Sequence, residues 1–187
     1  MKKNLLISIK LTAVFIILLA VIYPLFIAAV GKATPGGGNG EKLSVNGKVA
    51  GYANVGQKFT DDKYFRGRPS NVGYNAAGSG GSNKGPSNPD YLKTVQERID
   101  SFLVHNPGIT KSAIPVELVT ASGSGLDPDI SPAAASIQVK RIAAARNLSA
   151  DQLHTLVANH TQKPLLGLLG PSKINVLQLN IALDKLK

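Results

Sequence analysis

The sequence predicts an α+β protein, with one N-terminal transmembrane helix followed by a single mixed extracytoplasmic domain that has a small sheet and about four helices. Three observations support this fold class. Residues 11–31 carry no charged side chain. Asn46-Gly47 separates two short apolar runs, which is a strong signal for a β-hairpin. Farther along the chain, Asn and Ser caps precede apolar side chains at helical spacing.

The first element is the run LTAVFIILLAVIYPLFIAAVG at 11–31, which lies between Lys10 and Lys32. Its 21 residues would span roughly 31 Å as a helix, enough to cross a hydrocarbon core of about 30 Å. In lipid the run must be helical, because a helix satisfies its own backbone hydrogen bonds. Pro24 interrupts that ladder and predicts a kink. The alternative is a cleaved secretory signal, but the apolar core of such a signal is only about 7–15 residues long.

The charges around this run predict its orientation. Lys2, Lys3 and Lys10 precede it, and only Lys32 follows closely. Because cationic flanks stay on the cytoplasmic side, residues 1–10 are expected in the cytoplasm and everything after residue 32 outside it.

Composition narrows the possible functions of the rest of the chain. The whole chain has a formal charge of +10, so docking to an anionic surface and simple solubility are both consistent with it. Aromatic residues make up 5% and Trp is absent, which argues against a nucleic-acid partner that stacks bases. There is no cysteine, which excludes a disulfide framework and thiol chemistry.

Residues 32–42 are rich in Gly and predict a flexible neck before a soluble domain at 43–187. Strands are expected near 43–45 and 48–55, joined by a type I′ turn at Asn46-Gly47, because that turn needs positive φ at both positions.

The next stretch, QKFTDDKYFRGRPS, places aromatic and basic side chains next to one another. Arg66 and Arg68 can each form forked bonds with a carboxylate or a phosphate, so they suit either ion pairs or contacts with a partner. The Gly- and Ser-rich segment 73–89 is interpreted as an ordered loop, with a plain linker as the alternative. The side chains expected to dock a partner are Tyr64, Phe65, Arg66, Arg68 and Asn83.

Helix signals dominate the second half of the chain. Asn88-Pro89 opens a helix that ends at Asn106-Pro107-Gly108, and 115–122 is expected to be a brief strand or a buried turn. Ser131-Pro132 starts a second helix, which runs through about Arg146 with Lys140, Arg141 and Arg146 largely solvated.

Two further helices complete the prediction. Ser149 and Gln152 form a capping box for a third helix. The tail after Asn175 fits a helix or a strand, and we favour a helix capped by Asn175.

Two loops rich in Gly and Ser, 73–89 and 122–131, are the candidate sites for chemistry. Glycine lets backbone N–H groups converge on an anion, but neither loop carries a phosphate-loop motif, so tight turns remain the alternative. The three histidines lack metal-ligand spacing, and Asp127-Pro128-Asp129 lacks the ligand series of a calcium loop. No serine sits in a nucleophile motif. Neither a catalytic residue nor a metal site is therefore predicted.

Four segments carry a family likeness that runs from the apolar helix to the tail. They are QKFTDDKYFRGRPS, YNAAGSGGSNKGPSNP, ELVTASGSGLDPDISPAAASIQVKRIAAAR and INVLQLNIALD, in this order after one N-terminal span. In these segments the chain resembles the C subunit of the Kdp potassium-transporting P-type ATPase.

The resemblance implies a bacterial plasma-membrane complex with three partners: a channel-like potassium-binding subunit, a P-type ATPase subunit and a very small membrane subunit. It also implies a non-enzymatic catalytic chaperone that raises the affinity of the pump for ATP. No cofactor would be intrinsic, but ATP would be bound, and the candidates for nucleotide contact would be Ser122, Gly123, Ser124 and Gly125.

The predicted orientation conflicts with this last implication, because a domain outside the cytoplasm never meets cytoplasmic ATP. Either the orientation is reversed, or the subunit acts on the pump through the membrane partner. Two alternatives stay open beside the accessory subunit: a stand-alone, membrane-anchored extracytoplasmic module that binds envelope polymers, and an outward-facing hydrolase that uses a loop serine.

Overall fold

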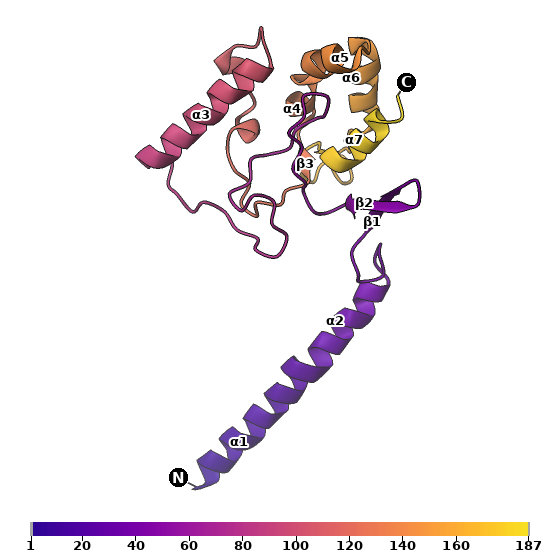
Figure 1. Ribbon diagram of the computed structural model, residues 1–187. Helices are drawn as coiled ribbons and strands as arrows, with labels where there is room; N and C mark the ends of the chain where they lie inside the picture. The colour runs from indigo at the N-terminus through magenta and orange to yellow at the C-terminus, as the bar shows by residue number, and fades with distance from the viewer. Residues whose placement is uncertain (1, 187) are drawn as a thin grey trace. The chain divides into compact units, whose positions relative to one another are not determined.

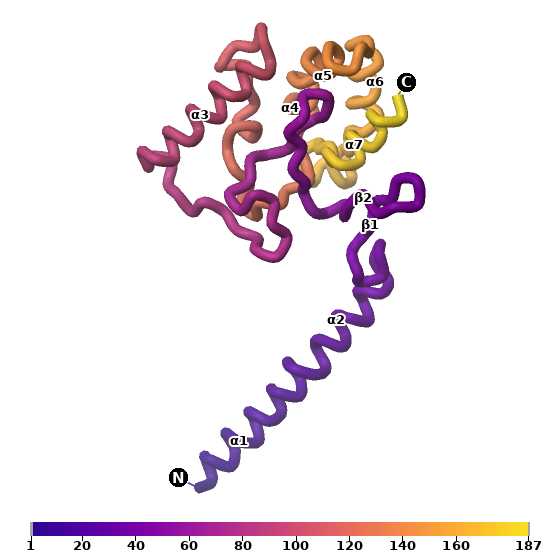
Figure 2. The backbone as a smooth tube through the Cα atoms, in the orientation of Figure 1, coloured from indigo at the N-terminus to yellow at the C-terminus, as the bar shows by residue number. Residues whose placement is uncertain are grey.

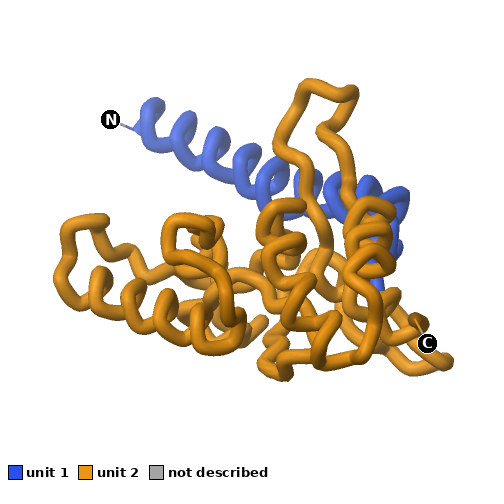
Figure 3. The backbone as a smooth tube through the Cα atoms, turned by 90° about the horizontal axis from the view of Figure 1, so that it is seen from above, with its two compact units in different colours: residues 1–42 blue, residues 43–187 orange. Residues whose placement is uncertain are grey.

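The computed structural model describes residues 2–186 and divides the chain into two compact units, residues 1–42 and 43–187 (Figure 3). Each unit is described here by itself.

A single helical rod forms most of the first unit (Figure 1). It consists of α1 (Lys2–Ile16), a π-helical stretch η1 (Ile17–Ile22) and α2 (Tyr23–Lys32). The wide turns of η1 directly precede Pro24, where the missing N–H and the ring disturb an ordinary helix. The sequence predicts a kink at this proline, and the structure has a π-helical stretch that ends two residues before it.

The rod Lys2–Lys32 is long and apolar enough to cross a membrane by its length and composition. Its large apolar side chains are exposed along the whole rod, from Leu5 to Val30. Because so large an apolar surface is unfavourable in water, lipid is the environment that suits this helix.

The predicted hairpin is confirmed. Strand β1 (Lys42–Val45) pairs with β2 (Lys48–Tyr52), and Asn46 and Gly47 between them have φ of 51° and 76°. These are the positive values that a type I′ turn requires. The second strand ends three residues earlier than the predicted position 55.

Three predicted helices are confirmed together with their caps. In α3 (Pro89–His105) the Asn88 side chain accepts from the Tyr91 N–H at 3.0 Å. Helix α6 (Ala150–Asn159) has the predicted capping box of Ser149 and Gln152. The tail forms helix α7 (Val176–Leu183), capped by Asn175, so the helical alternative is correct.

The helix predicted from 131 to 146 is wrong in one respect, because it is two helices, α4 (Pro132–Ser136) and α5 (Val139–Arg146). The interruption lies at Gln138. Its side-chain amide donates to the Ala134 carbonyl at 2.9 Å, which occupies the acceptor of an ordinary helical bond, and its own N–H bonds Ala135 instead.

The segment between α3 and α4 contains two 3₁₀ turns, η2 (Lys111–Ala113) and η3 (Val116–Leu118). Leu118 and Val119 are buried, so the predicted brief strand or buried turn is a buried turn. A second small sheet was not predicted. In it, β3 (Asp129–Ile130) pairs antiparallel with β4 (Ile174–Asn175), and Ile130 faces Ile174.

The core of the second unit lies among α4, α5, α6 and α7, and in Figure 1 these helices are gathered together while α3 lies apart from them. Its largest fully buried apolar side chains are Phe65, Ile142, Leu153, Ile174, Leu179 and Leu183. Five of these come from helices or from β4, and Phe65 comes from an irregular segment that the core must hold in place.

Candidate functional site

The irregular segment 57–70 is held by side chains rather than by a neighbouring strand. The backbone makes a long path without helix or strand between β2 and α3 (Figure 2). Backbone polar groups need partners when they are buried. Gln138 supplies two of them, because its side-chain oxygen accepts from the Arg66 N–H at 2.8 Å and its amide donates to the Arg66 carbonyl at 3.1 Å.

Asn180 of α7 binds the same segment one residue earlier. Its side-chain oxygen accepts from the Phe65 N–H, and its amide donates to the Phe65 carbonyl, both at 2.9 Å. Arg146 adds a bond to the Lys63 carbonyl at 2.8 Å. Buried Gln and Asn amides therefore imitate the two-way bonding of a strand and position the Phe65 ring in the core.

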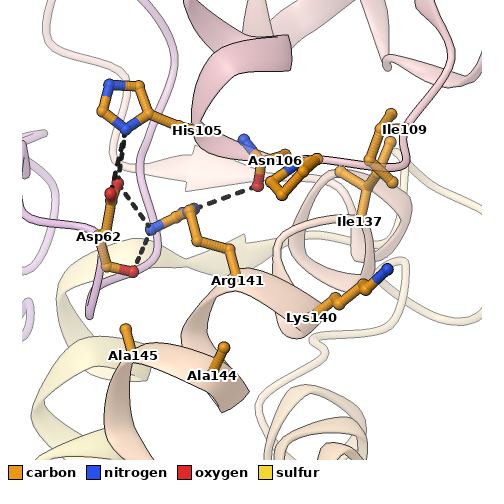
Figure 4. Close-up of a pocket in the computed structure, with 10 residues that line it drawn as sticks. Asp62, His105, Asn106, Ile109, Ile137, Lys140, Arg141, Ala144 and Ala145 are labelled. Carbon is orange, nitrogen blue, oxygen red and sulfur yellow. Dashed lines mark hydrogen bonds and ion pairs between the residues drawn. The ribbon is translucent and has the colours of Figure 1, made fainter.

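Arg141 of α5 is the centre of a buried polar cluster (Figure 4). Its guanidinium donates to the Asn106 side chain at 3.1 Å, the Gln138 side chain at 2.8 Å and the Tyr64 carbonyl at 3.1 Å, and it also donates to the Asp62 carbonyl. Burial, followed by the nearby Arg66 charge, lowers the pKa of Arg141 to about 10, while Asp62 opposes that change. The guanidinium is therefore charged at neutral pH.

Two guanidinium groups and an imidazole ring approach the Asp62 carboxylate. Arg66 lies 2.7 Å away, the His105 ring 2.9 Å and Arg141 3.8 Å. The carboxylate is 45% exposed, so water shares these interactions. Asp62 therefore joins the segment 57–70 to the C-terminal end of α3 and to α5.

A cavity of about 420 Å³ opens beside this cluster (Figure 4). Its polar wall carries Asp62, His105 and Arg141, and its apolar wall carries Ile109 and Ile137. The prediction that Arg141 is solvated is wrong, because its side chain is only 4% exposed. Lys140, one residue earlier, is exposed as predicted. The same prediction for Arg146 is wrong, because its side chain is only 15% exposed and lies against the Tyr64 ring.

The two predicted Gly/Ser loops pack directly against each other. The Ser124 carbonyl accepts from the Gly80 N–H at 2.8 Å and from the Ser79 hydroxyl at 3.0 Å. The Gly125 carbonyl accepts from the Ser70 hydroxyl at 2.6 Å. Gly125 has a φ of 68°, and a Cβ there would approach Val72 to 2.6 Å, so the contact requires glycine.

Arg68 and Asp127 pair across the same junction at 3.1 Å, and both side chains are largely buried. The Tyr74 hydroxyl donates to the Arg68 carbonyl, and burial, helped by the Asp127 charge, raises the pKa of Tyr74. The segment 68–80 is thus tied to 122–127 by the Arg68–Asp127 ion pair and by the bonds of Ser70, Ser79 and Gly80 to backbone carbonyls.

The four candidate nucleotide contacts lie on one side of this junction. Ser122 is buried and its N–H donates to the Pro69 carbonyl at 3.1 Å, while the Gly125 N–H donates to the Ser122 carbonyl. Gly123 and Ser124 are exposed. Two of the four backbone N–H groups are therefore already used inside the protein.

The five candidate docking residues separate in the structure. Phe65 is fully buried, so its ring belongs to the core and not to the surface. Tyr64 packs on Phe59 and donates to Asp184. Arg66 and Arg68 pair with carboxylates within the chain, and Asn83 is exposed.

Sequence reasoning missed the cluster around Arg141. One signal was available, because Arg141 lies four residues after Ile137 and three before Ala144 and therefore shares their helix flank. No comparable pattern pointed to Asp62, His105 or Asn106, which are far from α5 in the sequence.

The side-chain bonds described above connect segments of the second unit to one another. Among residues 2–186, no three His, Asp or Glu side chains gather as they would around a metal ion. The charged side chains of both clusters bond segments of the chain to one another. This arrangement suits a surface that must keep its shape against a partner.

Comparison with known proteins identifies the family to which this chain is similar. Residues 5–185 match the model of the family described as "KdpC: K+-transporting ATPase, c chain". A potassium-transporting ATPase KdpC subunit from Flavobacterium psychrophilum is 56% identical over 185 residues, covering 99% of this chain and all of the relative. KdpC subunits from Bacteroides fragilis and Herpetosiphon aurantiacus are 52% and 49% identical, covering 99% and 93% of this chain and 98% and 92% of the relatives.

Proposed function

Because the chain belongs to the KdpC family of potassium-transporting ATPase c chains, we propose that it is a non-catalytic accessory subunit of an ATP-driven, high-affinity potassium import complex. The observation that carries the proposal is the match over residues 5–185, which includes the apolar helix and the whole second unit. Its partners are the channel-like potassium-binding subunit, the P-type ATPase subunit and the small membrane subunit of the same complex.

The proposed location is the bacterial plasma membrane, spanned once by the helix within residues 2–32. The lysines at 2, 3 and 10 place the N-terminus in the cytoplasm and residues 43–187 outside it. In this arrangement the second unit meets its partners at the outer side of the membrane.

The proposed role is to assemble and stabilise the complex and, as a catalytic chaperone, to raise the affinity of the ATPase subunit for ATP. The internal bonding of segment 57–70 supports the structural half of this role, because Gln138, Arg141 and Asn180 hold that segment in one conformation. A surface held in advance loses little conformational entropy when a partner binds.

The test is to purify the complex with and without this chain and to measure potassium-stimulated ATP hydrolysis over a range of ATP concentrations. Without the chain, we expect a higher KM for ATP or complete loss of stimulation, with recovery when the full chain is added back. Unchanged hydrolysis and an intact assembly without the chain would refute the accessory role.

Direct nucleotide contact by Ser122, Gly123, Ser124 and Gly125 is the part of the proposal that needs its own test. A Cβ at Gly123 meets nothing within 4 Å, so this position accepts a side chain. In the assembled complex, Gly123→Asp should raise the KM for ATP several-fold over Gly123→Asn, because only the carboxylate repels a triphosphate. Equal KM values would show that the chain acts on ATP affinity through its partners.

A further inference from the structure

Residues 162–173 form a protruding hairpin that the proposed function does not use. At its base Gln162 and Lys173 exchange backbone hydrogen bonds of 2.8 and 3.0 Å. At its end Leu165 pairs with Leu169. The residues between, Pro164-Leu-Leu-Gly-Leu-Leu-Gly170, are here called the leucine tip.

The leucine tip exposes a concentrated apolar surface. Its leucines at 165, 166, 168 and 169 are 68%, 84%, 87% and 61% exposed. Other exposed apolar side chains of the second unit, such as Val104 and Val116, belong to separate elements. Large contiguous apolar patches on a folded domain indicate contact with a membrane or a partner.

Part of the backbone of the leucine tip is bonded within the tip itself. The N–H groups of Leu165 and Leu169 bond across the pair, and those of Gly167 and Leu168 bond the carbonyls of Pro164 and Leu165. Pro164 has no N–H. These four internal bonds lower the cost of bringing the tip into contact with lipid, because hydrocarbon offers no hydrogen-bond partner to an exposed backbone.

Backbone strain also points to a role for the side chains. Leu166 has a φ of 55°, a conformation that Gly, Asn or Asp adopts at lower cost than leucine. Leucine therefore does not stabilise the backbone conformation of this turn, and its side chain is 84% exposed.

Charge and tethering favour lipid over a protein groove. Lys163 and Lys173 flank the leucine tip, and Lys173 also pairs with Asp129 at 2.7 Å. Residues 43–187 contain 16 basic and 10 acidic side chains, a net +6 that suits anionic headgroups. The leucine tip carries no polar side chain, whereas protein interfaces ordinarily supply hydrogen bonds. The chain also links this domain covalently to a helix suited to lipid.

We propose that the leucine tip inserts into the headgroup and acyl boundary of the bilayer that holds the N-terminal helix, with Lys163 and Lys173 near the lipid phosphates. The four leucines then act as a second, shallow anchor that limits how far the second unit can rotate about its neck. This inference concerns contact with lipid and stands independently of the role in ATP hydrolysis.

The test uses the absence of tryptophan from the chain. Leu168→Trp places a single fluorophore at a position that is 87% exposed and needs no repacking. Val104→Trp, at a 79% exposed position on α3, is the matched control. Each full-length variant is reconstituted into vesicles of phosphatidylethanolamine and phosphatidylglycerol, with or without acyl chains brominated in both leaflets. Circular dichroism and the trypsin digestion pattern establish that both variants fold like the parent.

We expect the emission of Leu168→Trp to shift to shorter wavelength in vesicles and to be quenched by brominated lipid, while Val104→Trp shows neither change. Adding Lys163→Glu should reduce the quenching, because the anionic surface then repels the hairpin base. The proposal is overturned if both fluorophores behave alike. It is also overturned if the emission at position 168 shifts only in the assembled complex and without bromide quenching, which would assign the leucine tip to a protein groove.

Discussion

At the scale of single residues, Arg141 shows how a buried charge can organise an irregular backbone. It bonds the side chains of Asn106, just after α3, and Gln138, just before α5, and two carbonyls of the segment 57–70. Removing it would leave these acceptors without a donor in a place that water reaches poorly. Such unsatisfied groups cost more than the bonds themselves contribute.

Replacing Arg141 by Met should therefore lower the free energy of unfolding by about 2–3 kcal/mol, although Met keeps an unbranched apolar stem in place of the aliphatic part of Arg. Lys140→Met is the matched control, since Lys140 is the exposed neighbour on the same helix and should change stability by about 0.5 kcal/mol or less. Urea unfolding of the full chain in detergent, followed by circular dichroism at neutral pH, measures both. Similar losses in the two variants would show that the Arg141 cluster does not stabilise the fold.

At the scale of elements, the junction of the two Gly/Ser loops depends on close approach of their backbones. Gly125 packs against Val72 and Gly80, whereas Gly123, two residues earlier, has open space around its Cβ position. Two glycines of the same loop therefore differ in whether the structure leaves room for a side chain. Only the glycine with positive φ and close neighbours is required by the structure.

Gly125→Ala should lower the free energy of unfolding by about 1–3 kcal/mol, because it adds both a strained φ and a collision with Val72. Gly123→Ala should be nearly neutral. The loop released by Gly125→Ala should also be cut faster by trypsin at the exposed Lys84. Equal cleavage rates at Lys84 in the two variants would contradict the packing of the loops.

The helices also show which of their ends can be predicted from neighbouring residues alone. The caps at Asn88, Ser149 and Asn175 are confirmed, because each bonds an N–H only three residues away. The 131–146 stretch is wrongly predicted as one helix. Gln138, where it breaks, bonds the Ala134 carbonyl and also both backbone groups of Arg66, 72 residues distant. A pattern within one helix cannot contain that information.

At the scale of the whole molecule, orientation decides whether the second unit can meet ATP directly. The charge asymmetry around the apolar helix predicts that residues 43–187 lie outside the cytoplasm. In that case the candidates Ser122 to Gly125 cannot contact cytoplasmic nucleotide, and the effect on ATP affinity must pass through the partners.

The absence of cysteine permits a direct measurement. Lys84→Cys, in the loop between β2 and α3, should react with a membrane-impermeant maleimide on intact spheroplasts. Lys3→Cys, before the apolar run, should react only after lysis. The reverse pattern would place the second unit in the cytoplasm and make direct contact with ATP possible.

The sequence by itself determined the features that depend on neighbouring residues: the apolar helix, the Asn46-Gly47 hairpin, the helix caps and, through long motifs, the family. Tertiary structure alone decided the short β3–β4 sheet, the burial of Arg141 and the contact between the two Gly/Ser loops. These features join residues that are far apart in the sequence: Asp129 and Asn175 are 46 positions apart, Arg141 and Asn106 are 35, and Ser79 and Ser124 are 45. Local propensity and periodicity act over a few residues, whereas bonds of this kind are specified only when the core brings distant segments together.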